Sequence, residues 1–186
     1  MAIYSQIVAI CWLAFFASWA ILAAVLGGGS GRKPRVVTGL VIRLLIAAAL
    51  VLGAIYANRS STQVFDVDTG DLAAAGAVVC VVGLAFAIWA RVTLGANWGM
   101  PRTLHENPEL VTSGPYRYVR HPIYTGMAAM FIGTTLVEPY AAIPAVLVIL
   151  YSVFSALREE KDMQRQFPDA YREYRKRSKF LVPFLI

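Results

Sequence analysis

The chain has 186 residues, of which 58% are hydrophobic and only 15% are charged. This composition is too apolar for a soluble domain of the same length, and it indicates an integral membrane protein. The net charge of +6 would suit a nucleic-acid-binding protein if the basic residues formed one surface, but they lie mostly at the ends of apolar runs. We therefore expect a lipid bilayer as partner and no nucleic acid.

Five apolar segments predict an all-α bundle of five transmembrane helices in a single membrane domain, residues 1–186. The spans are expected at about 4–27, 36–57, 72–90, 122–137 and 139–157, since a helix needs about 20 residues to cross a bilayer. The first lacks a preceding basic stretch, so we expect a span and not a cleaved signal peptide. The fourth is short. It is expected to extend through its flanks or to form a tight hairpin with the fifth at Glu138–Pro139.

Loop charges predict the orientation of these spans. The first and third loops and the C-terminal tail are basic, whereas the second loop and the Glu138 hairpin are not. This alternation places the N-terminus outside and the C-terminus in the cytosol. Alanine-rich spans without an organelle signal are compatible with a bacterial inner membrane. Cys11 and Cys80 lie in separate apolar runs without a CxxC pair or a Cys/His cluster, so we expect buried thiols and no metal site.

The tail after the fifth span alternates charges with Phe167, Tyr171 and Tyr174, which share one face of a helix by their i, i+4, i+7 spacing. Pro168 is expected to break or restart that helix. The tail helix either lies on the membrane surface or covers a cytosolic site.

Topology brings two polar stretches together. Because the fourth and fifth spans run antiparallel, His121 and Pro122 at the start of the fourth must meet Glu159 and Glu160 at the end of the fifth. The free N–H groups of a helix start favour an anion, and Arg120 adds positive charge there. The pocket would therefore suit a zwitterionic ligand. The alternative is that the arginines and tyrosines are interface anchors paired with the glutamates.

The segment LVTSGPYRYVRHPIYTG, followed by REE and then by FPDAYREYRKRSKFLVPF, resembles the isoprenylcysteine carboxyl methyltransferase family and its wider phospholipid methyltransferase group. The resemblance covers residues 94–183, expected to form the methyltransferase-like core. It implies a membrane enzyme that uses S-adenosylmethionine, without a Rossmann fingerprint, bound in a cytosolic pocket.

Carried over by position, the resemblance assigns cofactor-binding and catalytic roles. The cofactor would be bound by Leu110, Val111, Tyr116, His121, Pro122, Tyr124 and Glu159. Arg120 would support the cofactor carboxylate or the pocket wall. For an amine or thiol acceptor, which must lose a proton, Glu160 or a tyrosine would be the candidate base. The family's substrate arginine is replaced by Ser155, with Arg158 as its candidate substitute. A proline, Pro168, stands where the family has a glycine.

The implied reaction is methyl transfer to a lipidic or small membrane-soluble acceptor, including the carboxylate of an isoprenylcysteine-like substrate. The cofactor would enter from the cytosol and the acceptor from the bilayer. A phospholipid amine or a thiol is an alternative acceptor. Two further alternatives stay open: an NADPH-dependent reductase, because FLVPFLI is also similar to membrane steroid reductases, and a non-catalytic membrane scaffold.

Overall fold

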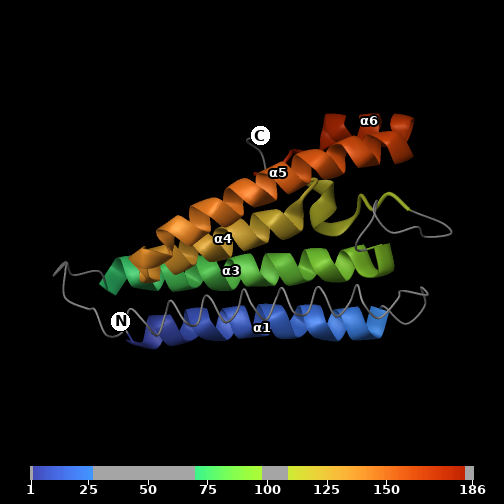
Figure 1. The fold of residues 1–186 in the computed structure, drawn as a ribbon. Coiled ribbons are helices and arrows are strands. Elements are labelled where there is room, and N and C mark those ends of the chain that lie inside the picture. Colours follow the sequence, from blue (N-terminus) through green and yellow to red (C-terminus); the bar gives the residue numbers. More distant parts are fainter. Residues whose placement is uncertain (1, 27–69, 98–108, 183–186) are drawn as a thin grey trace.

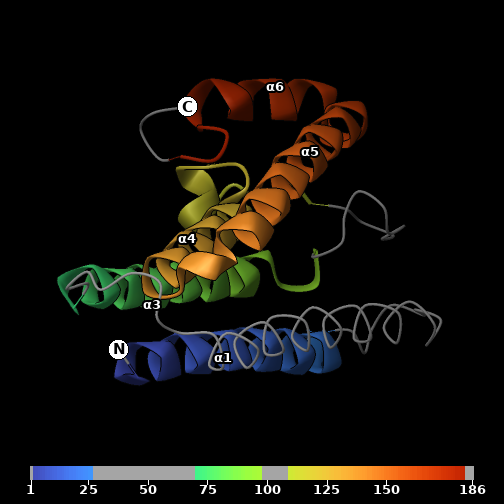
Figure 2. The same cartoon turned by 60° about the vertical axis from the view of Figure 1, so that its left-hand side comes forward.

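The computed structural model describes residues 2–26, 70–97 and 109–182, and these residues form helices without a β-strand. Three long helices, α1 (Ala2–Leu26), α3 (Gly70–Leu94) and α5 (Ala142–Gln166), run in the same direction, and α4 (Pro122–Val137) runs opposite to them (Figure 1). Short 3₁₀ turns connect them: η2 (Gly95–Asn97), η3 (Gly114–Arg117) and η4 (Pro139–Ala141). The last helix, α6 (Pro168–Arg177), lies across the end of α5 (Figure 2).

Three of the described helices are long and apolar enough to cross a membrane, over Ala2–Leu22, Gly70–Leu94 and Pro139–Gln166. They correspond to the first, third and fifth predicted spans. The predicted second span, 36–57, lies outside the described residues, so the count of five spans stays a prediction. The described part of the chain is thus all-helical, as expected from its composition.

The helices at the fourth and fifth predicted spans form a tight hairpin, one of the two arrangements expected from the sequence. Helix α4 has only 16 residues, ends at Val137 and is followed directly by η4 and α5. Helix α5 continues to Gln166, beyond the predicted end of the span at Leu157, because the charged residues that follow are good helix formers. Pro168 then starts α6 at a position where its missing N–H is harmless.

Close packing of α3 on α4 forms the most extensive contact in the described fold. Two glycine pairs, Gly76 with Gly133 and Gly83 with Gly126, bring the backbones together. A Cβ built on Gly83 would lie 2.7 Å from the carbonyl oxygen of Gly126, and one on Gly126 would lie equally close to that of Gly83. In a bilayer, where water drives no helix association, such small residues let helices gain van der Waals contact.

Helix α1 covers this pair with aromatic side chains. Trp12 lies 4.7 Å from the ring centroid of Phe131 on α4, and its indole N–H donates to Thr134 Oγ1 at 3.0 Å. Cys11 and Cys80 are both buried, as predicted. The helices thereby form one apolar core. The start of α4 and the end of α5 lie together at one end of it and carry the polar residues.

Candidate functional site

The segment 110–126, which we call the motif, packs against the end of α3 through η3. Gly114 has φ +56°, and a Cβ built there would lie 2.9 Å from Thr93 Oγ1, so a larger residue would be both strained and crowded. Below this turn Arg91 is buried and donates from Nη1 to the carbonyl of Gly95 at 2.9 Å. The glycine therefore lets η3 lie directly on α3 and fixes where Tyr116 and the residues after it stand.

Residues 178–182, which we call the C-terminal strap, pair with the motif through the backbone. The N–H of Lys179 donates to the carbonyl of Tyr118 at 2.9 Å, and the N–H of Arg120 donates to the carbonyl of Lys179 at 2.8 Å. Thr125 Oγ1 also donates to the carbonyl of Leu181. The strap is thus joined to both the loop before α4 and the first turns of α4.

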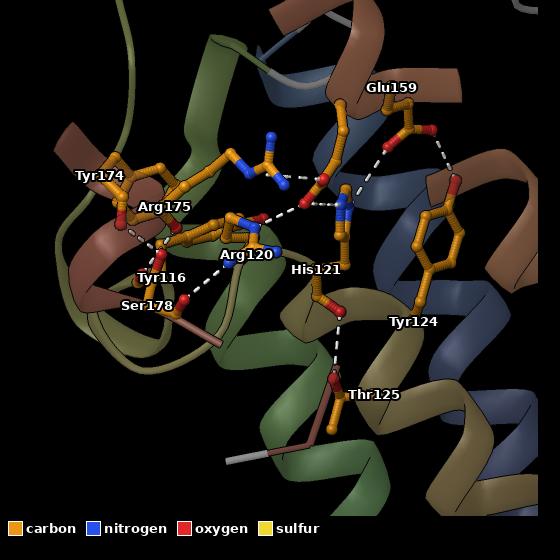
Figure 3. Close-up of polar contacts among 10 residues, drawn as sticks. Tyr116, Arg120, His121, Tyr124, Thr125, Glu159, Tyr174, Arg175 and Ser178 are labelled. Carbon is orange, nitrogen blue, oxygen red and sulfur yellow. Dashed lines mark hydrogen bonds and ion pairs between the residues drawn. The ribbon is translucent and has the colours of Figure 1, made fainter. Parts of the chain in front are cut away.

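Glu160 is the centre of an ion cluster beside the strap. Arg120 Nε contacts Glu160 Oε1, and Arg175 Nε lies 3.8 Å from Glu160 Oε2 (Figure 3). Arg120 also donates from Nη1 to the carbonyl of Ser178 at 2.6 Å. The side chains of Arg120 and Glu160 are nearly buried. The cluster therefore joins α5, α6, the strap and the loop before α4.

His121 lies between the two glutamates. Its Nδ1 is 3.7 Å from Glu159 Oε2 and its Nε2 is 3.7 Å from Glu160 Oε1. The ring is buried and meets Phe180 of the strap edge-on, with centroids 5.2 Å apart. Its Nε2 makes no hydrogen bond within the part of the chain that the structure describes. The predicted meeting of the α4 start with the α5 end is confirmed.

Glu159 differs from Glu160 in partners and in exposure. Tyr124 donates its hydroxyl to Glu159 Oε1 at 2.6 Å (Figure 3). The Glu159 side chain is 28% exposed, against 11% for Glu160. Glu159 is therefore the glutamate that a ligand from outside can reach, whereas Glu160 is already occupied by arginines.

Tyrosines of η3 and α6 complete the site. Tyr174 donates its hydroxyl to the carbonyl of Tyr116 at 2.6 Å. Burial raises the pKa of Tyr174 and of Tyr116 above its ordinary value, and burial together with the nearby Glu160 carboxylate raises the pKa of Tyr171. All three hydroxyls therefore stay protonated at neutral pH.

The other predicted site residues lie around this centre. Pro122 is buried at the first position of α4, and Leu110 and Val111 are half-buried in the segment before η3. Arg158 does not join the centre: it is exposed on α5, with its Cζ 4.4 Å from the ring centroid of Phe154. Ser155 is buried. The structure thus brings together Arg120, His121, Tyr124, Glu159 and Glu160.

Sequence reasoning missed Arg175, Ser178 and Phe180 as members of the site. All three lie in or just after a highly charged helix. From the sequence alone, such a segment is interpreted as exposed to solvent. The contacts become visible only once the strap pairs with Tyr118 and Arg120. Within the described ranges no group of three or more His, Cys, Asp or Glu side chains could hold a metal ion.

Fold and site together define a helical membrane protein with a charged, partly buried site at the junction of two antiparallel helices. The chain belongs to the phospholipid methyltransferase family, which it matches over residues 72–170. The match covers α3, the motif, α4, α5 and the start of α6, and hence most of the site just described.

Two kinds of relatives are similar to the chain. It is 28% identical over 137 residues to methanethiol S-methyltransferase 1 of Bradyrhizobium diazoefficiens, an alignment of 66% of this chain and 46% of the relative. It is 30% identical over 120 residues to protein-S-isoprenylcysteine O-methyltransferase of Rattus norvegicus, covering 61% of this chain and 42% of the relative. The chain thus spans less than half the length of either relative.

Proposed function

We propose that the chain is a membrane-embedded methyltransferase that uses S-adenosylmethionine and methylates a lipidic or small membrane-soluble acceptor. The observation that carries the proposal is the convergence of His121, Tyr124 and Glu159 at the end of the helix pair, in a chain of the phospholipid methyltransferase family. In this proposal residues 94–183 form the catalytic core of one membrane domain, with the site and the C-terminus on the cytosolic side.

The available groups fit the charges of this cofactor. His121 Nε2 is buried and faces Glu160 Oε1 at 3.7 Å, beyond hydrogen-bond length, so a ligand that hydrogen-bonds to it would improve its pairing. Glu159 offers a partly exposed carboxylate for an ammonium or a hydroxyl group. Tyr116, Pro122, Leu110 and Val111 would contribute the walls, with Tyr124 orienting Glu159.

When bound, S-adenosylmethionine supplies an electrophilic methyl group on a sulfonium. The chain's own contribution is alignment in a site from which water is largely excluded. Arg120 holds Glu160 and the strap in place. An acceptor carboxylate would already be ionised near pH 7, whereas a thiol or an amine must lose a proton, for which Glu159 is more accessible than the arginine-paired Glu160.

The names of the relatives indicate only the chemical class of the methyl acceptor. One is named for a thiol substrate and the other for an isoprenylcysteine carboxyl group, so both acceptor chemistries are candidates. The Arg158 guanidinium lies over the ring of Phe154. To bind an acceptor carboxylate near Glu159, the Arg158 side chain would have to change its conformation. The buried Ser155 leaves no cation at the position of the family arginine. These two observations favour a thiol over a carboxylate.

Calorimetric titration of the detergent-purified protein with S-adenosylhomocysteine tests the cofactor. We expect saturable binding that His121→Ala and Glu159→Ala each weaken at least about tenfold, as expected when a buried polar contact is lost. Arg117→Ala is the matched control, since Arg117 is an exposed residue of the same motif. Binding of NADPH in place of S-adenosylhomocysteine by the folded protein would overturn the proposal.

Transfer of a labelled methyl group then tests the acceptor. Purified protein in lipid nanodiscs is given S-adenosylmethionine with a small alkane thiol, an S-farnesylated cysteine derivative or phosphatidylethanolamine. We expect the thiol to be labelled most rapidly. Labelling of the farnesylcysteine carboxyl alone would reverse the preference for a thiol and leave the methyltransferase proposal standing.

A further inference from the structure

One face of α5 is exposed along its whole length and changes character halfway. At about 100° per residue, eight of the exposed side chains of α5 fall within a sector about 100° wide. In its first part this face, which we call the α5 stripe, is apolar, and in its last part it is basic. It comprises Ile143, Leu147, Leu150, Tyr151, Phe154, Arg158, Lys161 and Arg165.

The basic part of the stripe surrounds an open hollow. Arg158, Lys161, Asp162 and Arg165 line it. Arg165 Nη1 lies 3.6 Å from Asp162 Oδ1, but Arg158 and Lys161 form no ion pair with any residue that the structure describes. Three cations therefore face one carboxylate, and the hollow carries a net positive charge that an anion would neutralise.

Arg158 marks the boundary between the two parts. Its guanidinium lies over the ring of Phe154, one turn earlier on the stripe, at 4.4 Å from the centroid. The stretch from Leu147 to Arg158 rises roughly 16 Å at 1.5 Å per residue. That is close to the thickness of one leaflet, half of a hydrocarbon core of about 30 Å. The cations thus begin where acyl chains alongside the helix would reach their headgroups.

We propose that the α5 stripe binds an anionic phospholipid, with acyl chains along Leu147 to Phe154 and the headgroup phosphate in the hollow formed by Arg158, Lys161 and Arg165. The continuous apolar stretch favours a lipid over a free phosphate, and the uncompensated charge favours an anionic over a zwitterionic headgroup. Glu159 and Glu160 lie about 130° around the helix from the middle of the stripe, so this lipid is a bound partner and not the methyl acceptor.

Native mass spectrometry of the delipidated full chain, titrated with phosphatidylglycerol or phosphatidylcholine, tests this. We expect phosphatidylglycerol to bind more tightly, and the triple variant Arg158→Gln, Lys161→Gln and Arg165→Gln to raise its Kd by about tenfold to a hundredfold. Lys161→Gln alone should raise it by roughly fivefold. Circular dichroism confirms that each variant is folded.

The matched control removes the same charge elsewhere: Arg172→Gln, Lys176→Gln and Arg177→Gln on the exposed side of α6. This variant should bind phosphatidylglycerol as the unaltered protein does. Equal weakening by both triple variants would show diffuse attraction by net charge and overturn the proposal. Equal affinity for the two lipids, or displacement of the lipid by inorganic phosphate, would also overturn it.

Discussion

Glu159 and Glu160 are neighbours in the chain, yet the helix turns them about 100° apart and gives them different environments. Glu160 lies among Arg120, Arg175 and His121, whereas Glu159 accepts from Tyr124 and stays partly exposed. Removing a carboxylate from a buried ion cluster leaves its partners without compensation. We therefore assign Glu160 to holding the site together and Glu159 to contacting the ligand.

Glu160→Gln should lower the free energy of unfolding by about 1–3 kcal/mol, because Arg120 loses its charged partner in a nearly buried position. Unfolding in mixed detergent micelles, followed by circular dichroism, measures the change. Glu173→Gln is the control, because Glu173 pairs only with the exposed Lys176 within the described chain and should leave stability unchanged. Equal stability of the two variants would contradict the claim that the ion pairs of Glu160 stabilise the fold.

At the scale of elements, the strap is held by hydrogen bonds to its own backbone groups. We therefore expect the backbone N–H of Lys179 to matter more for its attachment than the Lys179 side chain. Lys179→Pro removes the N–H that donates to Tyr118. We expect faster amide exchange at Arg120 and easier proteolysis after α6, both measured by mass spectrometry. Lys179→Ala keeps the N–H and should behave like the unaltered protein. Identical exchange in the two variants would show that side chains alone hold the strap.

The contact between α3 and α4 depends on its glycines. Gly83→Leu places a side chain against the carbonyl of Gly126 and the backbone of Met130, so it should destabilise the fold by about 2 kcal/mol or more. The same unfolding measurement applies. Val82→Leu, on the exposed side of α3, is the matched control and should change little. A tolerated leucine at Gly83 would mean that the helices can separate without cost.

At the scale of the whole molecule, loop charges and helix directions lead to the same arrangement. Helices α1, α3 and α5 run one way and α4 runs the other. With a second span at 36–57, this agrees with an outside N-terminus and a cytosolic C-terminus. The ion cluster and α6 would then lie at the cytosolic face, where a soluble donor and a lipid-soluble acceptor can meet.

Reporter fusions test that orientation in a bacterial host. Green fluorescent protein fused after Ile186 should fluoresce and alkaline phosphatase fused there should be inactive, because the former folds in the cytosol and the latter outside. Fused after Glu138, between α4 and α5, the two reporters should give the opposite result. Active phosphatase after Ile186 would invert the predicted topology and move the site to the outer face.

Much of the fold and part of the site were predictable from the sequence. Uninterrupted apolar runs predict spans because every backbone polar group must pair inside the bilayer. The hairpin at Glu138–Pro139 and the restart at Pro168 are also local signals. The meeting of His121 with Glu159 and Glu160 follows from antiparallel helices alone.

The division between the two glutamates, the strap and the α5 stripe required the tertiary structure. Periodicity places residues on a helix face but does not say which face meets a neighbour. That choice depends on packing between distant segments, such as Ser178 with Arg120 and Tyr174 with Tyr116. The sequence by itself therefore determined the helices, their order and the residues that meet at the membrane edge. Only the tertiary structure decided which carboxylate is paired, which is accessible and which arginine faces outward, because burial and pairing are properties of the packed chain.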